Sequence, residues 1–338
     1  MSDLSSGVGD IERGVDHAGV PCGLTGSSRR ALHDERVASP RDVYEGFEHH
    51  DVMTDRGTVH TVTAGEGPPL LLLHGFPETH LMWHATAPLL TDRFSVVVCD
   101  LPGYGDSEYP EPAEDHLPHA KRTLARDLIQ VMASLGHERF AVAGHDRGGR
   151  VGYRMALDSP EVVTRLAVLD IVPTIEVWER ANDRFALLYW HWSFLARPAP
   201  QAEEMLLAAP PETFFSHHFE QVRNRHPGYT IEMVDDYLDR IDNPAAVRSM
   251  CEDYRAGASI DRELDASDRA AGRRIECPLL VLWGEEGALP LFYDDVLAVW
   301  SDWVRDPSQL SGRALDASHF IPEDQPTGTA SALAAFFS

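Results

Sequence analysis

The sequence has a single lysine among its 338 residues, Lys121, so arginine supplies nearly all of its positive charge. Lysine and arginine together number 29 against 54 aspartates and glutamates, which gives a formal net charge of −25 at pH 7. A protein that binds nucleic acid needs a basic surface to meet the phosphates, so we expect no nucleic-acid partner. A saline cytoplasm and a GC-rich genome each account for an acidic, lysine-poor composition, and both explanations stay open.

Long apolar segments are also missing. No run of about 18 apolar residues is present, so we expect no helix that spans a membrane. The longest apolar stretches, residues 69–73 and 94–99, have the length of buried strands instead. Residues 1–10 are polar and contain no apolar segment of the kind found in signal peptides, so we also expect no secretion signal.

Cysteine is scarce and irregularly spaced. The four cysteines are Cys22, Cys99, Cys251 and Cys277, and no two of them form a CxxC pair. Cys99 and Cys277 lie in or beside apolar, strand-like segments. This pattern indicates reduced, buried thiols in a cytoplasmic protein and excludes a disulfide framework or a clustered metal site.

Most of the sequence shows an alternation of predicted strands and helices. Residues 1–40, rich in Gly, Ser, Asp and Arg, predict a flexible extension outside the fold. Strands are predicted at residues 58–63, 69–74, 94–100, 140–144, 163–170 and 278–283, and helices at 121–135, 148–157, 291–303 and 328–337. Strands that alternate with helices predict an α/β fold, with a mostly parallel sheet flanked by helices.

Residues 172–265 interrupt this alternation. They carry aromatic and aliphatic residues at helical spacing and no clear strand. We therefore expect an inserted helical cap at residues 172–265, with the α/β core formed by residues 41–171 and 266–338.

The strongest local signal is the segment GHDRGGR at residues 144–150, between a predicted strand and a predicted helix. Small residues at this junction allow a sharp turn that projects Asp146 at the carboxyl edge of the sheet, as in a nucleophile elbow. A carboxylate can attack an sp³ carbon that carries a leaving group, and water must then cleave the resulting ester. The simpler interpretation is a glycine-rich turn in which Asp146 only caps the next helix.

Ester cleavage needs a base that activates water, and His319 is placed for this role. It follows strand-like residues 313–315 in the last loop before the final helix, where the α/β-hydrolase order supplies its histidine. Asp170, at the end of the strand after the nucleophile helix, is the preferred carboxylate to orient His319. Glu285 and Glu286, which follow a later strand, are the alternatives.

The segment HGFP at residues 74–77 follows another apolar strand. It is placed to direct the backbone N–H of Phe76 at the nucleophile, with the backbone N–H of Arg147 as a second donor. These donors would hold a carboxyl oxygen of Asp146 and the tetrahedral intermediate formed on it. His74 itself is interpreted as a residue that braces the loop.

Four motifs together resemble those of the fluoroacetate (haloacetate) dehalogenases, a family with the α/β-hydrolase fold. They are HGFPE at residues 74–78, GYGDS at 103–107, GHDRGGR at 144–150 and YWHW at 189–192. The similarity extends over residues 42–338. The first three motifs are shared with epoxide hydrolases and indicate a class of mechanism, whereas the features in the cap are more specific.

The resemblance implies that Arg147 and Arg150 bind the carboxylate of the substrate. It also implies that His191, Trp192 and Tyr254 donate hydrogen bonds to the departing halide. A guanidinium pair suits a small carboxylate, and fluoride leaves readily only when donors are already in place. Structural alternatives exist, because Arg150 could lie on a helix surface and His191 and Trp192 could be ordinary core residues of the cap.

We therefore expect hydrolytic dehalogenation of short 2-haloacids such as fluoroacetate, which yields a 2-hydroxy acid and halide. Asp146 would form the ester, and water activated by His319 would cleave it. We expect a cytoplasmic enzyme without metal or organic cofactor, because the sequence has no HExxH, Cys/His cluster or GxGxxG. The resemblance further implies a homodimer.

Two other functions stay open. An epoxide hydrolase would use the same Asp146 and His319, with Tyr254 and either Tyr189 or Tyr237 as acids toward the ring oxygen. A hydrolase fold that has lost catalysis and only binds a ligand is the second alternative.

Overall fold

The computed structural model describes residues 43–215 and 231–338 of the chain. The predicted N-terminal extension, residues 1–40, lies outside these ranges, and so does Cys22. Cys99, Cys251 and Cys277 are free thiols.

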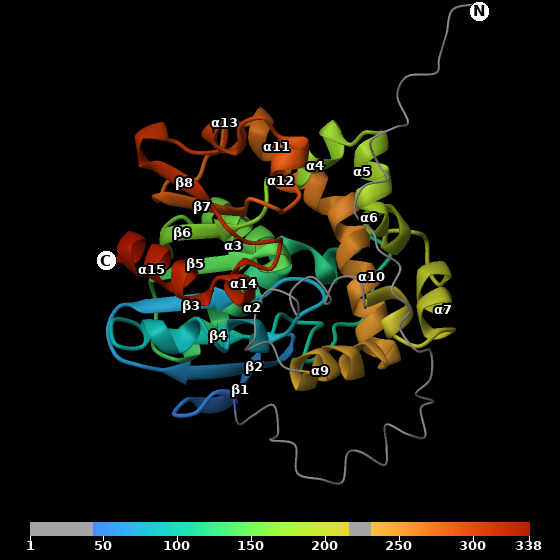
Figure 1. Ribbon diagram of the computed structural model, residues 1–338, viewed down its shortest axis with the longest axis horizontal. Helices are drawn as coiled ribbons and strands as arrows, with labels where there is room; N and C mark the ends of the chain where they lie inside the picture. Colours follow the sequence, from blue (N-terminus) through green and yellow to red (C-terminus); the bar gives the residue numbers. More distant parts are fainter. Residues whose placement is uncertain (1–42, 216–230) are drawn as a thin grey trace, which may run out of the picture. The chain divides into compact units, whose positions relative to one another are not determined.

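An eight-stranded sheet forms the centre of the described structure (Figure 1). Its strands are β1 (Glu48–Thr54), β2 (Gly57–Ala64), β3 (Pro69–Leu73), β4 (Ser95–Cys99), β5 (Phe140–His145), β6 (Val163–Leu169), β7 (Leu279–Gly284) and β8 (Leu310–Leu315). They lie in the order β1-β2-β4-β3-β5-β6-β7-β8. The pairs β1–β2 and β2–β4 are antiparallel and all other neighbours are parallel, so the predicted mostly parallel sheet is confirmed.

The burial of each strand explains whether it can be predicted from the sequence. Strand β3 is a run of four fully buried leucines between β4 and β5, as is typical of a parallel strand covered on both faces. Strand β1 is not predicted from the sequence, because Val52 is its single buried residue and its other side chains are polar or partly exposed. It lies at the edge of the sheet, where pairing with β2 through a tight turn replaces burial as the source of order.

Helices cover both faces of the sheet. In the core these are α2 (Lys121–Ser134), α3 (Asp146–Asp158), α12 (Leu289–Phe292), α13 (Val296–Ser301), α14 (Ile321–Asp324) and α15 (Pro326–Phe337), with short 3₁₀ turns η2 (His80–Trp83), η3 (Ala87–Leu90), η4 (Leu117–His119) and η5 (Pro307–Gln309). Figure 1 shows α14 and α15 in front of the sheet and α2 and α3 behind it.

One helix prediction is wrong. The sequence predicts a continuous helix over residues 291–303, but α12 ends at Phe292 and α13 begins at Val296. Tyr293 has an extended backbone, and the carboxylate of Asp295 accepts a hydrogen bond from the backbone N–H of Ala298. An N-capping aspartate at this position starts a new helix, which the apolar periodicity alone does not reveal.

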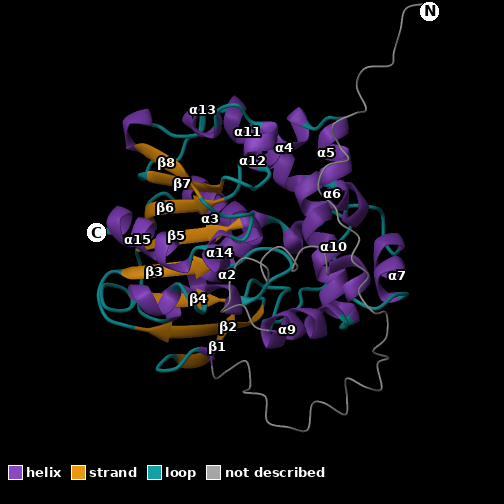
Figure 2. Cartoon of the chain, in the orientation of Figure 1, coloured by secondary structure: helices purple, strands orange, loops and turns teal. Residues whose placement is uncertain are grey.

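The segment between β6 and β7, called here the helical insertion, contains α4 (Thr174–Arg180), α5 (Asp183–Leu188), α6 (Trp190–Leu195), α7 (Gln201–Leu207), α9 (Ile231–Ile241), α10 (Pro244–Ala258) and α11 (Ile260–Ala270). Its described part contains no strand. Figure 2 shows α5, α6, α7 and α10 beyond the edge of the sheet toward which the parallel strands point. The boundaries of a separate cap at residues 172–265 remain a prediction. In the ranges 43–215 and 231–338, every helix is too short or too polar to cross a bilayer.

Candidate active site

The chain turns sharply where β5 ends and α3 begins. Asp146, the first residue of α3, has a φ of 41°, a conformation that costs a residue with a side chain about 1–3 kcal/mol. The turn is tight enough that a Cβ on Gly144 would lie 2.4 Å from the carbonyl oxygen of Gly148. A Cβ on Gly148 would in turn lie 2.5 Å from the carbonyl oxygen of His74. Both glycines are therefore required for the turn that places Asp146 at the carboxyl edge of the sheet.

Asp146 lies almost fully buried among positive charges. Its Oδ1 accepts a hydrogen bond of 3.1 Å from the backbone N–H of Phe76, the first of the two predicted donors. The second predicted donor, the backbone N–H of Arg147, makes no such bond to Asp146. Burial raises the pKa of Asp146, but the nearby charges of Arg147, His319 and Arg150 outweigh it and hold that pKa well below its usual range. The side chain is thus an anion with few hydrogen bonds, as a carboxylate nucleophile requires.

His319 lies in the loop between β8 and α14. Its Nδ1–H donates a hydrogen bond of 2.6 Å to Oδ2 of Asp170, which follows β6 in a left-handed conformation (φ 53°). The other oxygen of Asp170 accepts a bond of 3.0 Å from the backbone N–H of Gly284. Asp170, the carboxylate preferred from the sequence, thus contacts His319 directly. Glu285 and Glu286 are exposed.

Two carboxylates set the charge of His319. Burial lowers the pKa of its imidazole, but the hydrogen bond and charge of Asp170, together with the charge of Asp146, raise it to about 9. In the resting site His319 is therefore a cation between two anions at neutral pH. The loss of either negative charge would lower that pKa.

His145 and Glu78 hold the loop that carries His319, and the sequence analysis assigns neither a role. His145 is fully buried, with Nδ1 3.1 Å from Oε2 of Glu78 and Nε2 2.8 Å from the backbone carbonyl of His319. Both residues are part of motifs quoted above, HGFPE and GHDRGGR. Their adjacency in space links the loop after β3 to the loop after β8, which the linear sequence does not show.

Arg147 and Arg150 lie one helical turn apart on α3 and are 1% and 3% exposed. All three guanidinium nitrogens of Arg147 and Nε of Arg150 are buried and donate no hydrogen bond, although Nε of Arg147 forms an ion pair with Asp253. Buried donors of this kind carry a free-energy cost unless a ligand accepts from them. Burial and the neighbouring Arg147 charge lower the pKa of Arg150, whereas Tyr254, Asp253 and Asp146 outweigh burial and raise the pKa of Arg147. Arg150 is therefore the cation that an added anion would stabilise most. Arg150 does not lie on the helix surface, contrary to one alternative considered above.

Arg147 is held by aromatic faces and by one carboxylate. Its guanidinium lies 3.5 Å from the ring centre of Tyr254, and its Nε is 3.4 Å from Oδ2 of Asp253. Asp253 also pairs with Lys121, the sole lysine of the chain, which is 1% exposed and lies 3.1 Å from Asp261. The one lysine is therefore part of a buried ion network between α2 and the helical insertion, and its scarcity gave no hint of this position.

The three predicted halide-binding residues meet at the same place. Trp192 and Tyr254 are buried, and their ring centres are 5.9 Å apart. The ring of His191 lies 5.9 Å from that of Tyr254 and is stacked on Phe76 at 6.2 Å. The guanidinium groups of Arg147 and Arg150 lie 4.8 and 4.7 Å from the centre of the Trp192 ring. The helical insertion thus lays an aromatic surface against the two arginines.

The tyrosines that an epoxide hydrolase would need differ in their surroundings. Tyr237 donates its hydroxyl hydrogen to Oε1 of Glu323 at 3.1 Å, and so is engaged by another acid. Burial raises the pKa of Tyr189 well above its usual range, and the charges of Asp170 and Asp146 raise it further. The ring of Tyr189 lies 5.3 Å from that of His191, which lies 5.9 Å from that of Tyr254, so the pair Tyr189 and Tyr254 remains available to the alternative mechanism.

One group of three side chains in the described ranges has the composition of a metal site: His60, His80 and Asp100, all buried. Oδ1 of Asp100 already accepts hydrogen bonds from the backbone N–H and Nδ1–H of His80, at 2.6 and 2.9 Å. The charge of Asp100 outweighs burial and raises the pKa of His80. The contacts are those of an internal ion pair, and none of these residues belongs to the group around Asp146.

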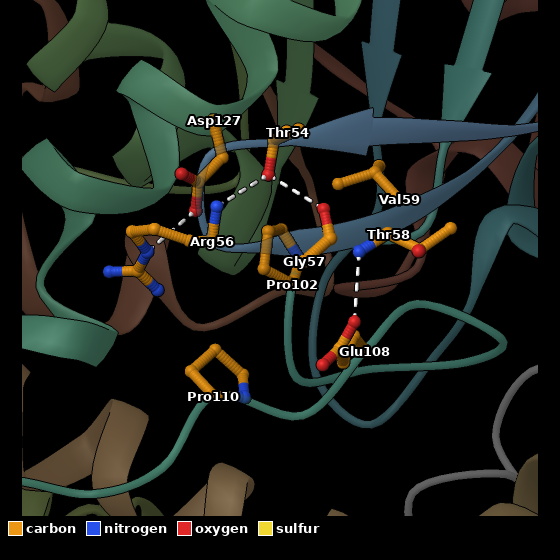
Figure 3. Close-up of a pocket in the computed structure, with 9 residues that line it drawn as sticks. All are labelled: Thr54, Arg56, Gly57, Thr58, Val59, Pro102, Glu108, Pro110 and Asp127. Atoms are coloured by element: carbon orange, nitrogen blue, oxygen red, sulfur yellow. Dashed lines mark hydrogen bonds and ion pairs between the residues drawn. The ribbon is translucent and has the colours of Figure 1, made fainter.

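A small cavity near the β1–β2 turn holds no substrate-sized space (Figure 3). It is lined by Thr54, Arg56, Gly57, Thr58, Val59, Pro102, Glu108, Pro110 and Asp127. Its volume of about 10 Å³ admits one water molecule at most. Figure 3 shows its polar atoms bonded to each other, with Arg56 facing Asp127 and Glu108 facing the backbone of Thr58. None of the predicted site residues lines it.

Comparison with known proteins agrees with this geometry. The α/β-hydrolase fold family matches residues 68–326. The chain is 41% identical over 297 residues to fluoroacetate dehalogenase from Burkholderia sp. The aligned region covers 88% of this chain and 95% of that protein. It is 31% identical over 284 residues to soluble epoxide hydrolase from Corynebacterium sp. (strain C12), over 82% of this chain and 93% of that protein.

A solved structure described as an α/β hydrolase from Nostoc sp PCC 7120 has a TM-score of 0.82 and 42% sequence identity, over 87% of this chain and 99% of that chain. These matches include the nucleophile turn and the helical insertion, and the resemblance predicted from the motifs is confirmed. The chain therefore belongs to the α/β-hydrolase fold family, where its relatives include a fluoroacetate dehalogenase and epoxide hydrolases.

Proposed function

We propose that the protein hydrolyses the carbon–halogen bond of short 2-haloacids such as fluoroacetate and releases halide and a 2-hydroxy acid. One observation carries the substrate class: Arg147 and Arg150 lie beside Asp146 with buried guanidinium nitrogens that donate no hydrogen bond. A small carboxylate supplies the missing acceptors and adds a negative charge beside Arg150, which has no salt bridge in the described part of the chain. An epoxide carries no charge and would leave both needs unmet.

In the first step Asp146 attacks the α-carbon of the bound haloacid while the arginines hold its carboxylate. The new bond joins an Asp146 oxygen to carbon, and the carbon–halogen bond breaks with its electron pair leaving on the halide. His191, Trp192 and Tyr254 are the proposed donors toward that halide. Charge develops there in the transition state, so donors already in position lower the barrier more than they stabilise the bound substrate.

In the second step water attacks the ester carbonyl of Asp146. His319 accepts the proton of that water, and Asp170 stabilises the imidazolium that forms. The backbone N–H of Phe76, which already donates to Oδ1 of Asp146, is placed to hold the oxyanion. Collapse of the intermediate breaks the bond between the carbonyl carbon and the ester oxygen. The His319 imidazolium gives its proton to that leaving oxygen, and the 2-hydroxy acid departs as the Asp146 carboxylate is restored.

The order of the two steps follows from the charges. His319 is held as a cation in the resting site because Asp146 and Asp170 are both negative. Formation of the ester removes the charge of Asp146, so the pKa of His319 falls below about 9 and the neutral base becomes available. Formation of the ester intermediate therefore favours the neutral form of His319, which is the form that cleaves this intermediate.

Epoxide hydrolysis is the competing proposal. It is favoured by the relative from Corynebacterium and by Tyr189 and Tyr254, whose rings lie 5.3 and 5.9 Å from that of His191. The same nucleophile would open the ring, with one tyrosine donating a proton to the ring oxygen.

A direct assay separates the two. The purified protein is incubated with fluoroacetate and with styrene oxide, and fluoride and diol are measured; Asp146→Asn is the inactive control. We expect fluoride from fluoroacetate and little diol. Diol formation with no fluoride, chloride or bromide from the haloacetates would replace the dehalogenase proposal with the epoxide hydrolase.

The absence of a metal or organic cofactor, the cytoplasmic location and the homodimer remain predictions. Light scattering on the eluted protein measures the mass in solution. A mass of one chain, about 37.5 kDa, would contradict the dimer.

A further inference from the structure

Arg150 is fixed by hydrogen bonds to residues at the start of the helical insertion. Its Nη1 donates to the backbone carbonyl of Val172 at 3.0 Å and to Oγ1 of Thr174 at 3.2 Å. The face of the guanidinium lies 4.7 Å from the centre of the Trp192 ring, and Nε has no acceptor. One edge of the guanidinium is thus fixed by the protein, and the edge with Nε is left for a ligand.

The contacts of Thr174 continue into a chain of hydroxyl groups that ends on a carboxylate. Oγ1 of Thr174 lies 3.0 Å from the hydroxyl of Tyr153, which lies 2.9 Å from Oδ2 of Asp265. The carboxylate of Asp265 accepts the single hydroxyl hydrogen of Tyr153. Oγ1 of Thr174 accepts from Nη1 of Arg150, and the Tyr153 hydroxyl beside it also accepts a bond of 3.0 Å from the backbone N–H of Thr174.

Every member of this chain is buried: Thr174 is 0%, Tyr153 1%, Asp265 1% and Arg150 3% exposed. Hydrogen bonds in such surroundings polarise each other and are stronger than in water. No carboxylate in the described part of the chain forms a salt bridge with Arg150. Asp265 is linked to Arg150 through the two hydroxyl groups, and its other oxygen lies 3.6 Å from Nη1 of Arg154.

The chain also joins distant parts of the sequence. Tyr153 belongs to α3, the helix that carries Asp146 and Arg150. Thr174 is the first residue of α4, where the helical insertion begins, and Asp265 is on α11, where it ends. The backbone N–H of Ile175 also donates to Asp265, at 3.2 Å. Both ends of the insertion are therefore fastened to the helix that presents Arg150.

We propose that Thr174, Tyr153 and Asp265 are positioning residues that fix Arg150 for the substrate carboxylate and thereby set the affinity for haloacids over uncharged halides. The proposal rests on the function proposed above. None of the three touches the substrate. They act by holding Nη1, so that the free edge of the guanidinium has one orientation before the ligand arrives, and preorganised donors bind more tightly than mobile ones.

The test is a binding measurement in an Asp146→Asn background, where no turnover occurs. Calorimetry gives the dissociation constants of chloroacetate, which is charged, and chloroacetamide, which is not. We expect Tyr153→Phe to weaken chloroacetate binding about tenfold, the size expected for one hydrogen bond that supports a charged group, and to leave chloroacetamide unchanged. Burial raises the pKa of Asp265 to about 7, so the measurement is made at higher pH, where this carboxyl is ionised.

Tyr44→Phe is the matched control, because its buried hydroxyl also donates one hydrogen bond, to the carbonyl of His80. We expect no change in binding of either ligand. A second pair guards against a misfolded Tyr153 variant: Thr174→Val removes the relay hydroxyl and Thr174→Ser keeps it. Chloroacetate binding is expected to weaken in the first and to be retained in the second.

Equal loss of both ligands in Tyr153→Phe would show a general structural defect and overturn the positioning role. Unchanged chloroacetate binding in Tyr153→Phe and Thr174→Val would overturn it as well, while leaving the proposed function intact. If chloroacetate fails to bind even the Asp146→Asn parent, the proposed function itself is contradicted.

Discussion

The groups at the carboxyl edge of the sheet are held by hydrogen bonds, whereas those from the helical insertion are held by ring packing. Asp146, His319 and Asp170 are joined to each other or to backbone N–H groups at 2.6–3.1 Å. Trp192 and Tyr254 contact the arginines through their faces, at 3.5–4.8 Å. Hydrogen bonds fix a proton-transfer geometry, and aromatic surfaces shape a pocket. In the proposed mechanism the sheet edge supplies the groups that form and cleave the ester, and the insertion supplies the groups that surround the halide.

This comparison predicts the largest effect at the sheet edge. Asp170→Asn keeps the size of the side chain but removes the charge that stabilises the His319 imidazolium. We expect steady-state fluoride release to fall about 10³–10⁴-fold, as for other orienting carboxylates of this type. Rapid mixing should still show a burst of fluoride, because the first step does not use the base. Loss of the burst as well would show that Asp170 also takes part in the first step, and would contradict its assignment to ester hydrolysis alone.

A smaller effect is expected at the arginines, which link the two regions. Arg150→Ala removes one of the two cations that meet the substrate carboxylate. We expect KM for fluoroacetate to rise about 30-fold or more, with a smaller change in kcat, since truncation of a buried charged contact costs about 2–5 kcal/mol. Steady-state kinetics of fluoride release measures both constants. Haloacetate kinetics equal to those of the unchanged protein would remove the carboxylate clamp from the mechanism.

How much of this was predictable from the sequence depends on whether the signal is local. The turn at Asp146 is encoded within seven residues, since Gly144 and Gly148 are needed for close backbone approach and the flanking strand and helix are apolar. Strand β1 could not be predicted, because it lies at the edge of the sheet and Val52 is its one buried residue. The break between α12 and α13 could not be predicted from the apolar pattern, because it depends on one capping side chain, Asp295.

The supporting residues of the site could not be found in this way. Tyr153, Thr174 and Asp265 are far apart in sequence, and each resembles an ordinary helix residue until the chain is folded. Lys121 and His145 are buried by contacts from other elements. Their neighbours are set by tertiary packing, which no single-sequence pattern records.

The insertion should control which halide is released. Trp192→Phe keeps an aromatic face for Arg147 and Arg150 and removes the indole N–H. We expect turnover of fluoroacetate to fall about tenfold and that of bromoacetate to fall less, because fluoride depends most on donors in the transition state. Parallel assays of fluoride and bromide give the ratio. An equal loss for both halides would assign Trp192 to packing alone.

The smallest expected effect is a pH dependence confined to the second step. Hydrolysis needs neutral His319, whose pKa of about 9 in the resting site falls once Asp146 is esterified. The rate of hydrolysis should therefore rise with pH and reach its plateau below about pH 9, while the burst rate shows no such rise. Single-turnover kinetics across this range separates the steps. A hydrolysis rate that decreases with rising pH would contradict the assignment of His319 as the base.

The claim that Asp146 forms a bond to carbon is tested most directly in His319→Ala, where water is no longer activated. The variant is mixed with fluoroacetate, digested and examined by peptide mass spectrometry. The account predicts one carboxymethyl group per chain, on the peptide that contains Asp146 and at that residue. An unmodified Asp146 in a variant that still releases fluoride, or a carboxymethyl group on another residue, would contradict it.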